Sequence, residues 1–451
     1  MSAFKVWARW SPLQPIESQK GEIQRESDQH GSNPESRISV TSPAPAKALS
    51  SRERSWKSGS SFDGIIEPDE NNHVAFTRVV APIIPEVLQG KCCNFFAYGH
   101  SGSGKTHSMI GYDFDHNDEF GLCLAAARQL TIALDGINTE DGAWRFGIGL
   151  RVCELRKNSA FDLLNNQNEC FVREGSDRRA YIRGETEMLE NGKVRVRPIV
   201  TRACWSFEEL RRELQEGLKH RKTATSTVHD QSSRTHAVIE LDIITKDLLN
   251  ARDDVVERQS ELVPVGKHAT DVYIEEQYHA MVQTEEGKLV PNPDYTVDQQ
   301  RIDAAEAKKA EFESYVKKAE EYESQVFSRT AQTHQCIGGK LVFLDLAGAE
   351  FLYGTAGTEL KQSPQEKQQG KQINTDLLAL KEVIRARSLA QPRIPYRSSP
   401  LTMVLREHFE TSSNTHSAMI LTVLSGADQY AATMNTLKYG DLVGLANGHK
   451  R

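Results

Sequence analysis

The sequence lacks the features that mark membrane and secreted proteins. No hydrophobic run approaches the roughly 18 residues that a membrane-spanning helix needs. The first residues, MSAFKVWARWSP, also lack the apolar core of a signal peptide. The 7 cysteines are odd in number and include no CxxC pair, which favours a reducing compartment. We therefore expect a cytoplasmic protein without a membrane span.

The sequence also lacks an excess of positive charge. Its 55 Lys and Arg against 62 Asp and Glu give a formal net charge of −7. This balance provides no overall basic surface for nucleic acid, so we expect no nucleic-acid partner, although one face could still be basic. The acidity is concentrated in residues 246–335, where 19 acidic residues face 11 basic ones. The rest of the chain is therefore close to neutral.

Strand and helix patterns alternate along most of the chain. Residues 17–60 are the exception, because they are rich in Ser, Pro, Gly and charge, and we expect a low-complexity loop insertion there. Apolar segments typical of strands are FKVWARW, CCNFFAY, FGIGLRVCEL, KVRVRPI, THAVIELDII and KLVFLDL. Helical patterns such as SFEELRRELQEGLKHR lie between them. This order predicts a three-layer α/β fold, in which helices flank both faces of a mostly parallel or mixed sheet of about eight strands.

Residues 246–335 form a second expected insertion. Their last third, TVDQQRIDAAEAKKAEFESYVKKAEEYESQV, is rich in Ala, Glu and Lys and predicts a long solvated helix. Two interpretations remain open for this segment. It is either a solvated hairpin without a function of its own or an arm that docks a partner helix.

The segment GHSGSGKT fits the phosphate-loop pattern GxxxxGK[ST] and follows the predicted strand CCNFFAY. Glycines let the backbone bend so that several N–H groups face phosphate oxygens at a helix N-terminus. Lys105 would reach the β- and γ-phosphates, and the Thr106 hydroxyl would coordinate Mg²⁺. The candidate phosphate-binding residues are Gly99, His100, Ser101, Gly102, Ser103, Gly104, Lys105 and Thr106.

Two further segments have the composition of nucleotide-sensing loops. In LVFLDLAGAE, Asp345 at a strand end would hold Mg²⁺ through water, and Gly348 would let its amide approach a γ-phosphate. In HDQSSRTHAVIEL, the hydroxyls of Ser232 and Ser233 would bind Mg²⁺ and γ-phosphate. Arg234 could pair with Glu350 and close the two loops. Taken alone, the Ser-Ser-Arg segment favours an ordinary helix cap or turn, and DxxG recurs in many nucleotide switches.

Together these segments resemble the kinesin motor domain over nearly the whole chain, 1–451, as a single domain. The segments that carry the resemblance occur in the family's order: FKVWARWSPL, FDGIIEP, FAYGHSGSGKTHSM, SSRTH, DLAGAE, INTDLLALKEVI, IPYRSSPLTMVL and MNTLKYGDLV. The family has a P-loop NTPase fold and hydrolyses ATP with Mg²⁺ on microtubules. The resemblance implies that Arg9, Pro12 and His107 border the adenine. It also implies that the Arg234–Glu350 pair gates the attacking water.

The resemblance implies tubulin contacts through Arg397 and through a helix that begins near Ile373, and hence a cytoskeletal location. Tubulin is acidic, so this face should be basic. However, Thr375, Pro400 and Met403 stand where the family has Lys, Lys and Arg. Nearby basic residues that could compensate are Lys361, Lys367, Lys371, Lys381, Arg385 and Arg393.

We therefore predict a microtubule-binding motor ATPase. An alternative is a divergent nucleotide-binding protein whose microtubule-stimulated motility is weak or lost. A GTP switch is a third possibility, because DLAG matches DxxG, but the sequence has no [NT]KxD element to read guanine. Cargo, direction of movement and oligomeric state do not follow from the sequence.

Overall fold

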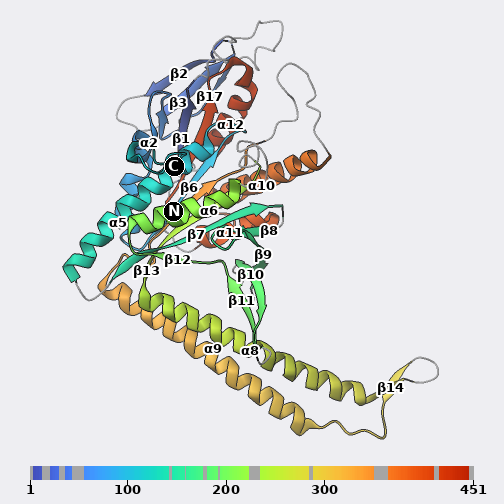
Figure 1. Ribbon diagram of the computed structural model, residues 1–451. Coiled ribbons are helices and arrows are strands. Elements are labelled where there is room, and N and C mark those ends of the chain that lie inside the picture. Colours follow the sequence, from blue (N-terminus) through green and yellow to red (C-terminus); the bar gives the residue numbers. More distant parts are fainter. Residues whose placement is uncertain are drawn as a thin grey trace. The chain divides into compact units, whose positions relative to one another are not determined.

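In the computed structural model, the chain folds into two compact units (Figure 1). The first unit comprises Met1–Ile182, Ile199–Ile244 and Gln335–Arg451, and the second comprises Arg183–Pro198 and Thr245–His334. The structure describes residues 4–12, 21–29, 36–42, 55–141, 145–157, 159–175, 180–190, 193–222, 234–283, 288–349, 364–410 and 416–445. The segment 246–335, predicted as an insertion, falls almost entirely in the second unit.

A buried parallel strand lies at the centre of the sheet in the first unit. Every residue of β6 (Cys92–Tyr98) is buried, as expected for a strand that is covered on both faces. It pairs in parallel with β16 (Lys340–Asp345) and with β17 (His416–Leu424). Beyond β17, β1 (Phe4–Ser11) and then β5 (Gly64–Ile66) continue the parallel part of the sheet.

The other half of the sheet is antiparallel where its pairing is defined. β13 (His236–Thr245) runs antiparallel to β16 and places Ala237 opposite Asp345. The order in the first unit is β9-β8-β7-β13-β16-β6-β17-β1-β5, and β12 pairs with β7. The remaining strands are β7 (Phe146–Arg156), β8 (Ser159–Asp162), β9 (Asn168–Glu174) and β12 (Arg202–Cys204). The sheet is mixed, as predicted, but has more strands than the expected eight because several are only three or four residues long.

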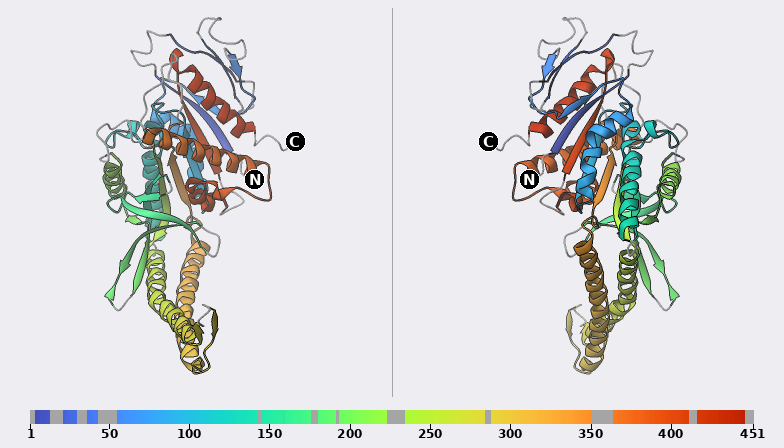
Figure 2. Two further views of the ribbon diagram at one scale, coloured as in Figure 1. Left: turned by 90° about the vertical axis from the view of Figure 1, so that its right-hand side faces the viewer. Right: turned by 90° about the vertical axis from the view of Figure 1, so that its left-hand side faces the viewer.

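Helices cover both faces of this sheet (Figure 2). One face carries α2 (Asn72–Val79), α5 (Leu122–Asp141) and α6 (Phe207–Lys222). The other carries α10 (Pro364–Ser388), α11 (Pro400–Glu410) and α12 (Tyr430–Leu445). The shorter helices are η2 (Ala81–Ile83), α3 (Ile84–Val87), α4 (Lys105–Met109), η3 (Asn117–Glu119), η5 (Tyr396–Ser398) and η6 (Ala427–Gln429). The three-layer α/β prediction is confirmed.

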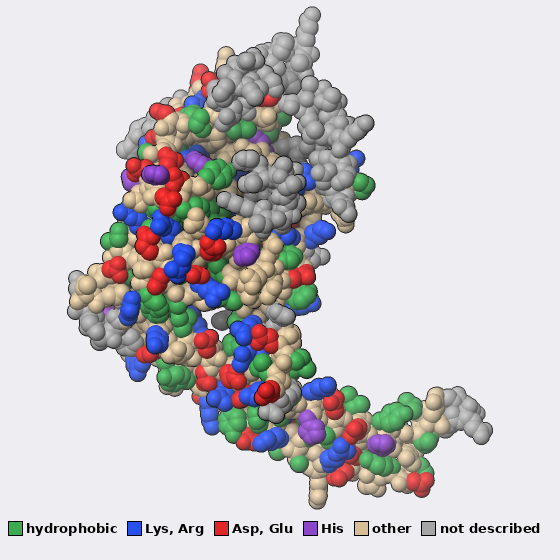
Figure 3. Space-filling view, viewed as in Figure 1, with side chains coloured by type: hydrophobic (Ala, Val, Ile, Leu, Met, Phe, Trp, Pro, Cys, Tyr) green, Lys and Arg blue, Asp and Glu red, His purple; other side chains and the backbone are tan. Residues whose placement is uncertain are grey.

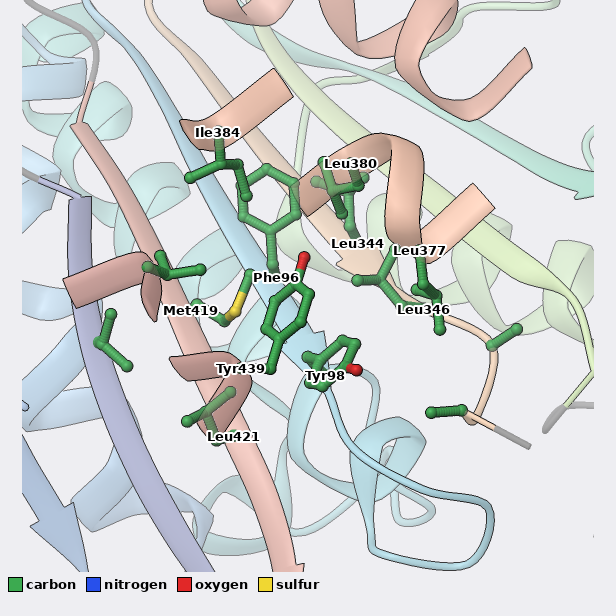
Figure 4. Packing of buried hydrophobic residues seen from close by; sticks show 14 of the residues in the cluster. Phe96, Tyr98, Leu344, Leu346, Leu377, Leu380, Ile384, Met419, Leu421 and Tyr439 are labelled. Carbon is green, nitrogen blue, oxygen red and sulfur yellow. The ribbon is translucent and has the colours of Figure 1, made fainter. Parts of the chain in front are cut away.

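The apolar core holds α10 and α12 against the central strands (Figure 4). The rings of Tyr98 on β6 and Tyr439 on α12 stack with centroids 4.0 Å apart. Each fully buried aliphatic side chain contributes about 1.5–3 kcal/mol to such packing. Core residues seen in Figure 4 are Phe96, Leu344, Leu346, Leu377, Leu380, Ile384, Met419 and Leu421. The helix that the sequence placed from near Ile373 begins earlier, at Pro364.

The segment 17–60 contains three strands, where the sequence predicted only a loop. β2 (Gln24–Gln29), β3 (Ser36–Thr41) and β4 (Ser55–Lys57) form a small antiparallel sheet. Within β3, Ile38 and Val40 are buried while Arg37 is exposed. The loop prediction is wrong for these strands, since a few alternating apolar residues are sufficient to anchor them in a Ser-rich segment.

The second unit is built on two long helices, α8 (Lys246–His279) and α9 (Gln299–Thr333), which pack against each other. A small hairpin of β14 (Met281–Gln283) and β15 (Leu289–Pro291) lies between them in the chain. The apolar seam between the helices includes Ala269, Val272, Ile302 and Ala305. The sequence predicted α9 but missed α8, because Pro264 interrupts its pattern. Both signs of charge are interspersed over these helices (Figure 3).

The second unit also contains β11 (Val194–Pro198), which pairs antiparallel with the end of β10 (Ala180–Met188). The Lys193 ammonium lies 2.8 Å from the Glu261 carboxylate on α8. Arg195 likewise pairs with Glu257. In the part of the chain that the structure describes, no helix is long and apolar enough to cross a membrane.

Candidate nucleotide-binding site

The phosphate loop connects β6 to α4 and has the backbone that its glycines predict. Gly102 and Gly104 adopt φ angles of +78° and +94°, which residues with a Cβ rarely adopt. A Cβ on Gly99 would lie 2.4 Å from the Thr422 carbonyl oxygen of β17. The turn is therefore packed directly against the sheet, and α4 begins at Lys105 with its N-terminus at the loop.

Lys105 is buried in this loop without a carboxylate partner among the described residues. Its side chain is only 5% exposed, and Nζ donates a hydrogen bond to the His100 carbonyl oxygen at 2.8 Å. Burial lowers the pKa of Lys105 to about 8, with Arg221 adding to the effect and Asp345 opposing it. The ammonium is therefore poorly compensated, and an anion bound in the loop would stabilise it.

Asp345 ends β16 and lies beside Thr106, and the prediction that the two residues hold Mg²⁺ stays a prediction. The Thr106 hydroxyl donates to Asp345 Oδ2 at 2.8 Å. Arg221, at the end of α6, also donates to Oδ2, at 2.7 Å. Oδ1 is buried and accepts no hydrogen bond from the described residues. A buried carboxylate oxygen without a donor is an unsatisfied acceptor, which a metal-bound water would satisfy.

Glu154 on β7 supports Arg221 from the opposite side. It is fully buried, and its Oε1 lies 3.7 Å from Arg221 Nε. The Thr235 hydroxyl donates to the same oxygen at 2.6 Å, and Arg156 pairs with the other carboxylate oxygen. Sequence reasoning missed both Glu154 and Arg221. Only Glu154 could have been noticed in the sequence, because it is an acidic residue within the apolar segment FGIGLRVCEL.

The DLAG segment packs backbone to backbone on the phosphate loop. The Ala349 amide donates to the Gly99 carbonyl at 3.1 Å. A Cβ on Gly348 would lie 2.6 Å from the Ser101 amide nitrogen, so only glycine allows this approach. The Ala347 amide donates to His236 Nδ1 at 3.0 Å. Gly348 thus lies beside the phosphate loop between two hydrogen-bonded neighbours, and the predicted approach of its amide to a γ-phosphate stays a prediction.

The predicted adenine-side residues occupy neighbouring elements. The Arg9 guanidinium is buried and donates to Asn72 Oδ1 at 2.6 Å and to Ser108 Oγ at 3.0 Å. Asn72, which sequence reasoning missed, in turn donates to the His107 carbonyl at 3.1 Å. Burial lowers the pKa of His107, so its ring is neutral near pH 7. Pro12 is exposed directly after β1.

Three predicted residues, Ser232, Ser233 and Glu350, lie outside the described residues. Arg234 is described, and its carbonyl accepts a hydrogen bond from Gln369 Nε2 on α10 at 3.4 Å. The predicted Arg234–Glu350 pair therefore stays a prediction.

The predicted tubulin-facing residues lie on α10, η5 and α11. The side chain of Arg397 is 72% exposed and makes two hydrogen bonds of 2.7 Å to the Glu174 carboxylate. The Thr375 hydroxyl donates to the Lys371 carbonyl at 2.9 Å. Pro400 and Met403 lie in the first turn of α11.

The residues present fit a magnesium-bound nucleoside triphosphate. The described residues contain no group of three or more His, Cys, Asp or Glu side chains that could hold a metal alone. A metal held by one hydroxyl, water and phosphate oxygens needs no such group. Thr106 and Asp345 provide the protein side of such a site.

Comparisons with known proteins agree with the resemblance. The profile of the kinesin motor domain family matches residues 9–266 and 311–444. Kinesin-like protein KIN-13A of Oryza sativa subsp. japonica is 26% identical over 385 residues, which cover 85% of this chain and 34% of that protein. Kinesin-like protein Klp61F of Drosophila melanogaster is 24% identical over 84% of this chain and 27% of that protein. The chain thus spans about a third of these relatives, or less.

A solved structure of a fast kinesin is similar in fold. It superimposes with a TM-score of 0.60 at 20% sequence identity, over 98% of this chain and 91% of the other.

Proposed function

The chain belongs to the kinesin motor domain family, and we propose that it is a magnesium-dependent ATPase whose hydrolysis cycle is coupled to microtubule binding. The observation that carries this proposal is the meeting of the phosphate loop with the segment LVFLDLAGAE. Asp345 Oδ2 lies 2.8 Å from the hydroxyl oxygen of Thr106 at the end of the loop, and Gly348 packs on Ser101.

The phosphate loop would bind the triphosphate through its amides and Lys105. The lowered pKa of Lys105 supports this role, because a buried ammonium without a carboxylate gains most from a phosphate anion. Thr106 and Asp345 would hold Mg²⁺, which neutralises the charge that develops between the β- and γ-phosphates. Arg221 would hold the Asp345 side chain in its rotamer through the hydrogen bond to Oδ2.

The two loops around the γ-phosphate would act as a switch. We infer that Ser232 and Ser233 bind the γ-phosphate side, and that Arg234 and Glu350 orient the attacking water. The Gly348 amide would sense the γ-phosphate, and the hydrogen bonds that hold both of its neighbours support this role. Loss of the γ-phosphate would release these contacts, as in other nucleotide-dependent loop transitions.

The readout would be the position of α10 on tubulin. Gln369 on α10 donates a hydrogen bond to the carbonyl of Arg234 in the Ser-Ser-Arg segment. A movement of that segment would therefore change the position of α10. Arg397 and the basic residues of α10 would face the acidic track.

A second candidate function is nucleotide binding with weak or lost microtubule stimulation. Its support is the loss of three basic positions at Thr375, Pro400 and Met403. The ion pair of Arg397 with Glu174 also supports it, because Arg397 is the remaining predicted tubulin-contacting residue and its charge is already paired.

Microtubule co-sedimentation at two salt concentrations tests both candidates. It should be performed with ATP and with a non-hydrolysable analogue, since a motor binds in a nucleotide-dependent and salt-sensitive way. Lys105→Ala should abolish nucleotide binding and remove the nucleotide dependence. Glu350→Ala should bind ATP without hydrolysing it, and unchanged turnover would exclude the proposed gating role. Intact basal turnover without microtubule stimulation would favour the second candidate.

A further inference from the structure

His236, the first residue of β13, is a buried histidine, and one of its two ring nitrogens is engaged in a hydrogen bond. Its side chain is 3% exposed, and Nδ1 accepts the Ala347 amide hydrogen at 3.0 Å. Burial, together with the positive charges of Arg221 and Lys105, lowers its pKa to about 3. A neutral imidazole that accepts at Nδ1 carries its proton on Nε2. His236 therefore has one N–H group left to donate.

That N–H group faces a carboxylate on α10 without reaching it. Nε2 is buried and has no hydrogen-bond partner among the described residues. The Asp376 carboxylate lies close by, with Oδ2 3.8 Å from Nε2. A hydrogen bond between nitrogen and oxygen is usually about 2.9–3.0 Å long, so the gap is about 1 Å too wide.

Asp376 is a buried carboxylate on α10. It is 5% exposed, and its Oδ1 accepts a hydrogen bond from Gln372 Nε2 at 3.1 Å. Burial raises the pKa of Asp376 to about 6, against the hydrogen bonds from Gln372 and Ser399. Asp376 thus lies beside the Nε2–H group of His236, which the described residues leave unpaired, and it can accept a hydrogen bond from that group.

We propose that Asp376 is a positioning residue that links α10 to the second switch loop through His236, by accepting the Nε2–H hydrogen bond in the ATP-like state. The bond would fix the His236 ring, and His236 in turn holds the Ala347 amide, one residue before Gly348. A relative movement of α10 and β13 by about 1 Å makes or breaks the bond. This inference rests on the proposed function and names a contact through which the nucleotide moves α10.

The link has a direct consequence for nucleotide preference. A state in which Nε2–H is bonded is favoured over one in which it is buried and unpaired, by about tenfold. By reciprocity, a nucleotide that favours the bonded state binds more tightly when the bond is available. Removing the acceptor should therefore lower the preference for an ATP analogue over ADP.

The experiment measures the affinities of the full chain for a fluorescent non-hydrolysable ATP analogue and for fluorescent ADP, both with Mg²⁺. Asp376→Leu removes the acceptor and keeps a branched side chain with the same number of heavy atoms. Asp376→Asn is the matched control, because its carbonyl oxygen can accept from Nε2–H while Gln372 turns its amide to accept from the new NH₂. We expect the analogue-to-ADP preference to fall about tenfold for Asp376→Leu and less than twofold for Asp376→Asn.

His236→Asn tests the link from its other end, since the amide oxygen replaces Nδ1 for Ala347 but nothing reaches Asp376. It should show the same tenfold fall, also if Asp376→Leu does not fold. In the His236→Asn background, Asp376→Leu should change the preference by less than twofold. Equal behaviour of the Leu and Asn variants, or independent effects of the two sites, would overturn the link. Failure of the unmodified chain to bind either nucleotide would overturn the proposed function together with the link.

Discussion

The close approach of Gly348 to the phosphate loop leads to a strong prediction for Gly348→Ala. The new Cβ would lie 2.6 Å from the Ser101 amide nitrogen and 2.7 Å from the Ser101 Cα. Both atoms belong to backbone, which cannot rotate away as a flexible side chain would. Either the phosphate loop or the DLAG segment must shift to accommodate the methyl group.

The size of the effect follows from this geometry. Ordinary van der Waals contact of a Cβ begins near 3.4 Å, so a shift of several tenths of an ångström is needed. Forcing one methyl group into a packed site costs about 1–3 kcal/mol. Since 1.4 kcal/mol corresponds to a factor of ten, we expect the affinity for a Mg²⁺–ATP analogue to fall by about 10- to 100-fold.

Gly136→Ala on α5 is the matched control, because a Cβ there has no neighbour within 4 Å. Alanine in a helix interior should stabilise the fold by about 0.5–1 kcal/mol and leave nucleotide affinity unchanged. The assay is a titration with fluorescent nucleotide, accompanied by urea unfolding of each variant. If Gly348→Ala bound the analogue within twofold of the unmodified chain, the packing of these two loops would be refuted.

Three further predictions concern charge. Buried Lys105 has a pKa of about 8, so it loses the charge that binds phosphate as the pH rises above that value. The dissociation constant for Mg²⁺–ADP should therefore be constant below about pH 7 and rise about tenfold per pH unit well above pH 8. A dissociation constant that stays the same up to about pH 9.5 would contradict this prediction. Burial opposes protonation of His408, but Glu240, 3.2 Å away, raises its pKa to about 10. The resulting stabilisation of the fold is complete below about pH 6.5 and is lost as the pH rises through 10. His408→Gln should lower the free energy of unfolding by on the order of 3 kcal/mol at neutral pH, and urea unfolding of this variant should show a weaker decline of stability with pH. An unchanged decline would exclude the ion pair. Glu174→Gln frees Arg397 and should raise microtubule affinity about two- to threefold at low salt, because exposed ion pairs are weak, and an unchanged or lower affinity in co-sedimentation would contradict this.

The parts of the site that depend on local sequence could be predicted. The phosphate loop needs a strand, glycines and a lysine in one stretch of chain, and Cys92–Thr106 provide all of them. Asp345 was predictable because an acid at the end of an apolar strand lies at the sheet edge where the loop begins. Gly348 followed from its spacing to Asp345. The alternation of strands and helices was sufficient to predict the three layers.

The parts that depend on distant segments meeting could not be predicted. Arg221 reaches Asp345 across 124 positions of sequence, and no spacing rule connects them. His236 and Asp376 are likewise brought together only by the packing of α10 against the sheet. The strands within 17–60 were missed because composition dominated over a short alternation. α8 was not predicted, and Pro264 interrupts its helical pattern.

The central claim is that ATP bound beside Lys105 and Asp345 is hydrolysed under the control of a microtubule. The most direct measurement is the rate of phosphate release with Mg²⁺–ATP at low salt, as a function of microtubule concentration, with Lys105→Ala as the blank. We predict a saturable rise of about tenfold or more over basal turnover for the unmodified chain and none for the variant. A rate that stays at the level of Lys105→Ala at every microtubule concentration would contradict the account.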